Sequence, residues 1–461
     1  MPTTAAPPPW SPSDACFAVR DWGLLDAIRH NTQRFCEHGD SASTSQVTLI
    51  RVANAGVRAM VFRGLELDLR RVTVDAPIHS LAQDGGGHDP RFVLNPSMVR
   101  CSCAELATFA SEQYRRTGRP LRLWDPYLAK VSKTLDDPAS LCGSPQPSSQ
   151  VNPAGMEQPS ADQVVEIPDR VVVLARRDDH NPFFQVSYVL NAWLLQRALE
   201  WDPLAVPTRV LQLDAGYPSA LDELQSRLLA SPSQPEIIRG ATSLQGKRVR
   251  FLSDVLFPPF ETSGPMMQHL DDNEPCVNSD LFQQFRAESL RVMGVAPPAE
   301  PPTGSAPLVV TIISRRNYSG RQVQRRWLNE AEIVAQMQEM YGAMATIQSV
   351  EFVDLPLAQQ MQLMLESDVV IGMHGAGMVN VLWTRPGTLV IEIFPRTRRR
   401  WGYRNLCQFV GCEWHEFRGG KDTGMGDNAS DKWIEFGEWH SFLAPLLRQQ
   451  MQKQRATTAS V

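Results

Sequence analysis

The chain has 461 residues, of which 43% are hydrophobic and 21% charged, enough apolar residues for two cores of ordinary domain size. Its formal net charge of −5 and pI near 6.0 provide no long-range positive field, so nucleic acid and anionic lipid are not predicted partners. No apolar run approaches the roughly 18 to 20 residues of a membrane span, and residues 1–13 lack the pattern of a signal peptide. We therefore predict a soluble chain without a membrane span. It is either a lumenal portion separated from its anchor or a chain made without one.

The eight cysteines are sparse and show no C-x-x-C spacing, so no zinc site is predicted and their pairing stays open. Two glycosylation sequons begin at Asn317 and Asn428. Such sequons are used only in the secretory pathway, and they slightly favour a lumenal protein.

Composition divides the chain into several segments. Residues 1–13 are rich in proline and small residues and are predicted to be a disordered tail. An N-terminal α/β domain is predicted over 14–296, with a Pro/Ser-rich insertion near 136–163. Four prolines within 297–304 mark a linker, followed by a C-terminal Rossmann-like domain over 305–447 and a tail over 448–461.

The N-terminal half gives few clear signals. Its periodicity predicts a strand over 170–175, a helix over 186–198 and a strand over 208–213. Residues 15–130 show no pattern that orders them. Layered α/β structure is the expectation for this half.

The C-terminal half alternates strands and helices with short connections. The expected strands are 308–313, 349–353, 369–373, 389–394 and 413–417, and the expected helices are 329–341, 357–365, 379–383 and 405–410. This alternation predicts a parallel sheet covered by helices on both faces. Because such sheets bind ligands at the carboxyl ends of their strands, the turns after Ile313, Met373 and Ile393 are the expected site.

A glycine-rich turn follows the expected strand at 369–373. It consists of His374, Gly375, Ala376 and Gly377 and leads into a short helix containing Asn380. The glycines allow backbone N–H groups to approach an anion, and the helix adds its positive end, so the turn is suited to a phosphate. A tight turn with glycines for packing alone is the alternative.

Arginines occur in the loop between the first expected strand and the next helix. Arg315 follows the strand directly, and Arg326 precedes Asn329 and Glu330 at the start of the helix. Guanidinium groups here suit the charge on a departing diphosphate, with Asn329 as helix cap and Glu330 in the first turn. A solvated loop is the alternative.

An acidic segment with one histidine follows the strand at 170–175. Asp179 and His180 are candidates to deprotonate an acceptor hydroxyl, although such a cluster can also be a hydrogen-bonded loop. The chain contains no D-x-D, so we predict no metal or other cofactor. Positive side chains and helix ends would take the place of a cation.

These motifs together resemble the family 61 glycosyltransferases. The resemblance rests on H-G-A-G followed by P-G-x-x-V-x-E-I-F-P over 374–395, and on S-R followed by L-N-E over 314–330. It implies a GT-B fold of two facing Rossmann-like domains and an inverting, UDP-sugar-dependent transferase of the Golgi or ER lumen. It also implies that Arg315 and Arg326 contact the diphosphate, that the His374 turn binds the nucleotide, and that Glu392 lies near the ribose.

Within this family the segment 315–330 is most similar to the plant-type N-glycan core β-1,2-xylosyltransferases. The resemblance therefore favours UDP-xylose as donor and an N-glycan or glycoprotein as acceptor. A UDP-GlcNAc-dependent protein O-GlcNAc transferase of the same family is the alternative. A Rossmann oxidoreductase is disfavoured because the turn lacks the third glycine of G-x-G-x-x-G.

The sequence departs from the family pattern at one place. Where the family commonly has a histidine and, four residues later, an aspartate, this chain has Phe184 and Tyr188. This departure moves the expected base to Asp179 or His180. It also leaves open a catalytically silent homologue that binds a glycan or nucleotide without transferring sugar.

Overall fold

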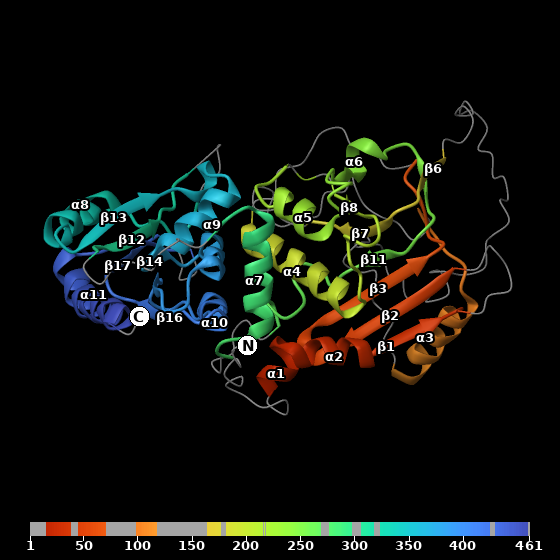
Figure 1. Ribbon diagram of the computed structural model, residues 1–461, viewed down its shortest axis with the longest axis horizontal. Helices are drawn as coiled ribbons and strands as arrows, with labels where there is room; N and C mark the ends of the chain where they lie inside the picture. The colour runs from red at the N-terminus through yellow and green to blue at the C-terminus, as the bar shows by residue number, and fades with distance from the viewer. Residues whose placement is uncertain are drawn as a thin grey trace. The chain divides into compact units, whose positions relative to one another are not determined.

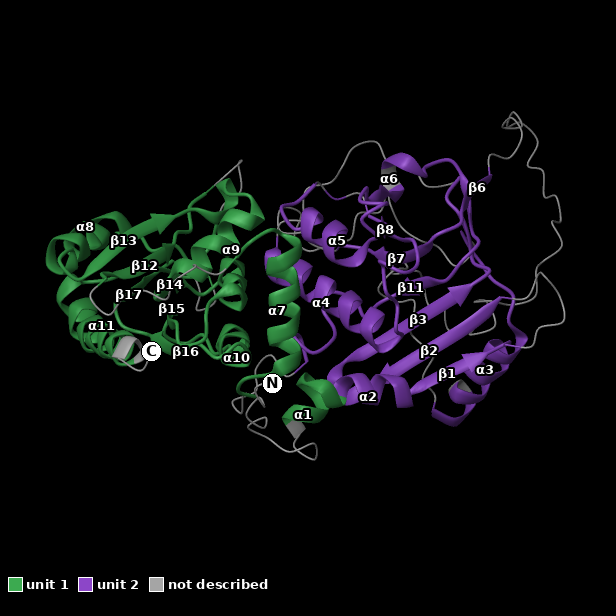
Figure 2. Ribbon diagram, in the orientation of Figure 1, with its two compact units in different colours: residues 1–23, 269–461 green, residues 24–268 purple. Residues whose placement is uncertain are grey.

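The structure is a computed structural model. It describes residues 15–37, 45–70, 98–117, 164–176, 181–214, 216, 218–268, 276–296, 306–317, 323–424 and 429–459. The chain divides into two compact units: unit 1 comprises residues 1–23 and 269–461, and unit 2 comprises residues 24–268 (Figure 2). The predicted tail at 1–13, insertion at 136–163 and linker at 297–304 lie outside the described residues. Residues 269–296, which the sequence grouped with the N-terminal half, belong to unit 1.

Unit 1 is built on a five-stranded parallel sheet (Figure 1). Its order is β13 (Ala345–Val350), β12 (Leu308–Ile313), β14 (Val369–Met373), β15 (Leu389–Ile393), β16 (Glu413–Phe417). The three middle strands are rich in Val, Ile and Leu and buried almost throughout, as strands covered on both faces must be. The predicted parallel sheet is confirmed.

Helices cover both faces of this sheet. On one face the core includes Ile333 and Met337 of α8 (Glu330–Tyr341) and Trp439 of α11 (Phe436–Ala459). The other face contacts α9 (Leu357–Glu366) and the 3-10 helix η6 (Ala376–Trp383). Two further helices, α10 (Gly402–Phe409) and α7 (Asp280–Val292), pack against η6. A short hairpin of β17 (Lys421–Thr423) and β18 (Asp431–Trp433) precedes α11. Unit 1 also contains α1 (Ala15–Arg20).

Two predictions in unit 1 were wrong in detail. The strand expected at 349–353 begins instead at Ala345, because its register with β12 pairs Leu308 with Ala345, and Phe352–Asp354 forms a 3-10 turn, η5. Residues 448–459 are part of α11 rather than a tail. The side chain of Gln450 donates to the carbonyls of Asp368 and Gly387, so this part of α11 is fixed to the segments that precede β14 and β15.

The described residues of unit 2 form two sheets. The larger has the order β1 (Thr32–Phe35), β2 (Gln46–Val52), β3 (Val57–Arg63), β11 (Val255–Phe257), β7 (Arg170–Leu174), β8 (Thr208–Gln212), β9 (Ile238–Arg239). The strands from β1 to β11 pair antiparallel, and those from β11 to β9 pair parallel. The smaller sheet has the order β5 (Val99–Arg100), β4 (Glu66–Asp68), β10 (Arg248–Phe251), β6 (Val164–Ile167).

The helices of unit 2 include one that is buried all round. This is α4 (Pro182–Ala198), which confirms the predicted helix at 186–198, as β7 and β8 confirm the two predicted strands. The other helices among the described residues of this unit include α2 (Trp22–His30), η1 (Ala53–Ala55), α3 (Ala104–Thr117), α5 (Asp222–Leu229) and α6 (Gly240–Ser243). The α/β class predicted for this half is thereby confirmed.

Disulfides join distant segments within each unit. Cys16 bonds Cys276 in unit 1, and Cys36 bonds Cys103 in unit 2. A third, Cys407–Cys412, links the end of α10 to the start of β16. Among the residues that the structure describes, no helix has the length and apolar character of a membrane span.

Candidate functional site

Two loops of unit 1 meet at the carboxyl edge of its parallel sheet. β12 and β14 are neighbours, and the helices that follow them, α8 and η6, pack on opposite faces of the sheet. In open α/β sheets, ligands bind in the crevice where neighbouring connections leave in opposite directions. The loop after Ile313 and the turn after Met373 therefore form the candidate site.

Arg315 reaches from the first loop to the second. A Cβ added to Gly375 would lie 2.5 Å from Cζ of Arg315, so any other residue here would displace the guanidinium group from its present position. The φ of Gly375 is 167°, an extended backbone that any residue adopts, so the close approach of Arg315 and not the backbone favours glycine here. Nη2 of Arg315 also donates to the carbonyl of Gln324 at 3.1 Å. The structure thus brings together two predicted elements of the site.

Both the backbone and the ring of His374 are held by contacts, although the residue lies in a turn. Its backbone N–H donates to the carbonyl of Ile393 at 2.8 Å, and its ring stacks on Phe394 with centroids 4.8 Å apart. Nδ1 lies 2.5 Å from the Glu392 carboxylate, which accepts its hydrogen. Burial lowers the pKa of His374, and Glu392 opposes this shift. A neutral ring with Nδ1 protonated leaves Nε2 as a hydrogen-bond acceptor.

Glu392 is completely buried, and both of its carboxylate oxygens bind other side chains. One carboxylate oxygen binds His374, and the other accepts from Nε1 of Trp414 at 2.9 Å. The side chains of Ile391 and Ile393 belong to the core on the opposite face of β15, so strand alternation places Glu392 on the η6 side. Glu392 therefore orients the His374 ring.

The remaining residues of the turn begin η6. Ala376 is its first residue, and a Cβ on Gly377 would make only ordinary contact, 3.4 Å from Cγ2 of Ile313. Asn380 is 2% exposed and its side chain donates to the carbonyl of Gly377 at 3.1 Å. Asn380 thus supports the turn from within the helix.

Arg326 is bound to the hairpin that precedes α11. Its guanidinium forms an ion pair with Asp431 at 2.6 Å, and its backbone N–H donates to the same carboxylate at 2.8 Å. Its carbonyl accepts from the backbone of Lys432. Asp431 raises the pKa of Arg326. The diphosphate contact predicted for Arg326 would therefore compete with this ion pair.

Asn329 and Glu330 also have partners within unit 1. The side-chain cap predicted for Asn329 is absent from α8. Asn329 instead exchanges two hydrogen bonds with the backbone of Ile434. Because these bonds occupy both the oxygen and the nitrogen of its amide, the side chain does not bind the backbone of the helix. Glu330 opens α8 as predicted, is 7% exposed, and accepts from the hydroxyl of Ser349 at 2.6 Å.

Two residues at this edge were missed by the sequence analysis. Nε of Arg325 donates to the carbonyl of His374 at 2.8 Å, and Tyr403 of α10 lies beside the His374 ring with centroids 5.4 Å apart. Burial raises the pKa of Tyr403, and Arg315, Arg325 and Arg398 all oppose that shift. The adjacent arginines at 325 and 326 were visible, but no pattern in the sequence says which of them faces the turn.

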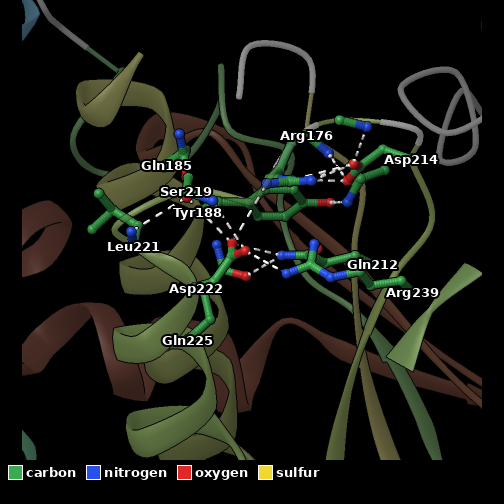
Figure 3. A network of polar contacts seen from close by, with 12 residues as sticks. Arg176, Gln185, Tyr188, Gln212, Asp214, Ser219, Leu221, Asp222, Gln225 and Arg239 are labelled. Carbon is green, nitrogen blue, oxygen red and sulfur yellow. Dashed lines mark hydrogen bonds and ion pairs between the residues drawn. The ribbon is translucent and has the colours of Figure 1, made fainter. Parts of the chain in front are cut away.

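Unit 2 has its own polar cluster at the carboxyl ends of β7 and β8 (Figure 3). Arg176 follows β7 with a side chain only 1% exposed, and Asp214 follows β8. Nη2 of Arg176 lies 2.7 Å from Asp214, and Nη1 lies 3.4 Å from Asp222. The predicted residues Asp179 and His180 belong to the segment directly after Arg176 and lie outside the described residues.

Asp222 is the centre of this cluster. It accepts from Nη2 of Arg239 at 2.6 Å and from the side chain of Gln212 at 3.0 Å, in addition to Arg176 (Figure 3). Two arginines and two aspartates thus balance one another in charge. A buried polar network whose members are paired in this way makes this end of the sheet rigid.

Tyr188 and Phe184, the two departures from the family pattern, lie on α4. The Tyr188 hydroxyl accepts from the backbone N–H of Ala175 at 3.0 Å, and the side chain is 1% exposed. Asn181 caps the same helix through a hydrogen bond from the N–H of Phe183. Tyr188 therefore holds the end of β7 against α4. Within the described residues, no three His, Cys, Asp or Glu side chains are grouped to hold a metal ion.

Comparison with known proteins bears on this site directly. Residues 167–391 match the family model described as Glycosyltransferase 61. The chain contains a glycosyltransferase domain. The match starts at the end of β6 and ends within β15, so it spans parts of both units and includes Arg315 and the His374–Gly377 turn. It supports the predicted family.

A curated relative agrees with this assignment. The EGF domain-specific O-linked N-acetylglucosamine transferase of Drosophila melanogaster is 31% identical to this chain over 159 residues. The match covers 33% of this chain and 27% of the relative, so it extends over about a quarter of that protein's length.

Proposed function

We propose that this chain transfers a sugar from a UDP-sugar to a hydroxyl group of a glycan, with inversion at the anomeric carbon. The observation that carries the proposal is the meeting of Arg315 with the His374–Gly375 turn at the carboxyl edge of the unit 1 sheet. The family match over 167–391 supports it. The GT-B arrangement of two facing domains is part of the proposal.

The donor's phosphates would lie between Arg315 and the turn. As the bond between the anomeric carbon and the phosphate oxygen breaks, negative charge grows on the departing UDP, and a preorganised guanidinium group stabilises it. Nε2 of His374 would accept a hydrogen bond from a ribose hydroxyl. Glu392, predicted to lie near the ribose, would act there through His374.

The acceptor would bind on the side of unit 2. Its hydroxyl oxygen attacks the anomeric carbon opposite the leaving UDP, a new C–O bond forms, and the proton passes to a base. Asp179 and His180 stay our candidates for that base. An α-linked donor then gives a β-linked product. We propose that no metal ion takes part, because guanidinium groups can neutralise the diphosphate.

Two donor sugars are supported by different observations. The segment 315–330 resembles the xylosyltransferase branch and favours UDP-xylose with an N-glycan acceptor. The relative from Drosophila is named as a transferase of N-acetylglucosamine to EGF domains, which favours UDP-GlcNAc with a protein acceptor. Disulfides in both units support a secretory compartment, and we place the enzyme in the Golgi or ER lumen.

UDP release by the purified chain tests the proposal. UDP-xylose and UDP-GlcNAc are each supplied without acceptor, with a mannose-cored N-glycan and with a folded EGF domain, in the presence and absence of EDTA. We expect acceptor-dependent release with one donor, unchanged by EDTA. The Arg315→Gln variant should lose it, whereas Arg316→Gln should retain it, because Arg316 is 59% exposed and pairs with Glu351.

Three other outcomes would contradict part or all of the proposal. Loss of activity in EDTA, restored by a divalent cation, would contradict the metal-independent mechanism. UDP binding without transfer to any acceptor would favour the silent homologue. A chain that neither binds UDP nor transfers sugar would contradict the proposal as a whole.

A further inference from the structure

Arg325 has a backbone conformation that is unusual for its residue type. Its φ is 59°, in the left-handed region. A residue with a side chain rarely occupies this region, and such strain persists where the surrounding structure holds a side chain in a particular place. The strain lies at the edge of the sheet where the donor is proposed to bind.

The left-handed backbone separates two adjacent arginines. Arg326 forms its ion pair with Asp431 and continues into the bridge between Trp327 and Lys432. Arg325 instead donates from Nε to the carbonyl of His374. Neighbouring residues of the same type therefore serve different parts of unit 1.

Arg325 and Arg315 converge on the same two residues. Arg315 occupies the space in front of Gly375, where a Cβ would collide with it, and Arg325 binds the carbonyl of His374 directly before that glycine. The two guanidinium groups come from opposite ends of one loop. They meet at the turn that precedes η6.

This convergence places like charges together. Burial lowers the pKa of Arg325, and the neighbouring charge of Arg315 lowers it further. A single neutral N–H donor would be enough to brace the His374 carbonyl. A second guanidinium beside the first gains its advantage when an anion binds both, because forked donors match phosphate oxygens.

We propose that Arg325, together with Arg315, binds the donor's diphosphate, and that Arg326 is a structural residue of the hairpin. This assignment rests on the proposed function. It moves the second phosphate-binding arginine by one position from the one that the sequence predicted.

Titration of the full chain with UDP and with uridine tests the assignment. UDP binding is measured by calorimetry, weaker uridine binding by NMR line broadening, and folding by thermal unfolding. In Arg325→Gln we expect UDP affinity to fall about 10- to 100-fold, the range for lost hydrogen bonds to a charged group, while uridine affinity is unchanged. Arg325→Lys should fall between, because it keeps the charge and loses the fork.

Arg326→Gln is the matched control. It should unfold at a lower temperature, because Asp431 loses its ion pair and keeps only the backbone N–H of residue 326, and it should bind UDP like the wild type. Wild-type UDP affinity in Arg325→Gln, or an equal loss of UDP and uridine, would overturn the assignment. So would selective loss of UDP binding in Arg326→Gln. A wild-type chain that does not bind UDP would refute the proposed function itself, and with it the assignment.

Discussion

Replacing Gly375 with alanine adds one methyl group at the point where Arg315 approaches the turn most closely. The new Cβ would lie 2.5 Å from Cζ of Arg315, so the guanidinium group must move. The backbone need not change, because a φ of 167° is open to alanine. The substitution therefore acts as a selective displacement of Arg315.

The expected effects on stability and on binding differ. Displacing Arg315 removes its hydrogen bond to the Gln324 carbonyl, which contributes about 0.5 to 1.5 kcal/mol to the free energy of unfolding. The same displacement removes a charged contact to the phosphates, about 1.5 to 3 kcal/mol, which corresponds to a roughly 10- to 150-fold loss of UDP affinity. We expect a nearly unchanged melting temperature and a large loss of UDP binding.

Gly437→Ala is the control for this experiment. Gly437 lies in α11, and its added Cβ would meet no atom within 4 Å, so UDP affinity should stay close to that of the wild type. Calorimetric titration with UDP and thermal unfolding of the three proteins provide the measurements. Wild-type UDP affinity in Gly375→Ala, or an equal loss of affinity in both alanine variants, would refute a phosphate contact by Arg315 at this turn.

Two further predictions concern stability. Burial lowers the pKa of His374 from 6.5, so just below about pH 6.5 the unfolded chain binds a proton that the folded chain does not. The free energy of unfolding should therefore fall as the pH drops through this range. In urea unfolding, the His374→Gln variant should show a smaller decrease. Identical pH profiles would contradict this. Arg176→Met should cost about 3 to 5 kcal/mol in chemical unfolding, because it leaves Asp214 and Asp222 buried without Arg176. Arg227→Met, at a side chain 52% exposed, should cost less than about 1 kcal/mol, and equal costs would show that burial does not decide the effect.

The sequence predicted the strands of unit 1 well because their burial leaves a simple pattern. Strands covered on both faces are continuous runs of apolar residues, so β12 and β14 were placed with their observed bounds. Their ends indicated the candidate site at the turns after Ile313 and Met373. The parallel order of the sheet followed from the alternation with helices.

The missed details depend on contacts that are distant in sequence. Which of Arg325 and Arg326 faces the His374 turn is set by Asp431, about a hundred positions later, and by the φ angle of Arg325. The cap predicted for Asn329 was wrong because Ile434 binds its side chain. The bounds of β13 depended on its pairing with β12 rather than on its own residues.

The position of the phosphates in a crystal structure with UDP is the most direct test of the account. We predict that the diphosphate lies between the guanidinium of Arg315 and the His374–Gly375 turn, with a ribose hydroxyl within hydrogen-bonding distance of Nε2 of His374. UDP bound with its phosphates away from Arg315 and this turn would contradict the central claim.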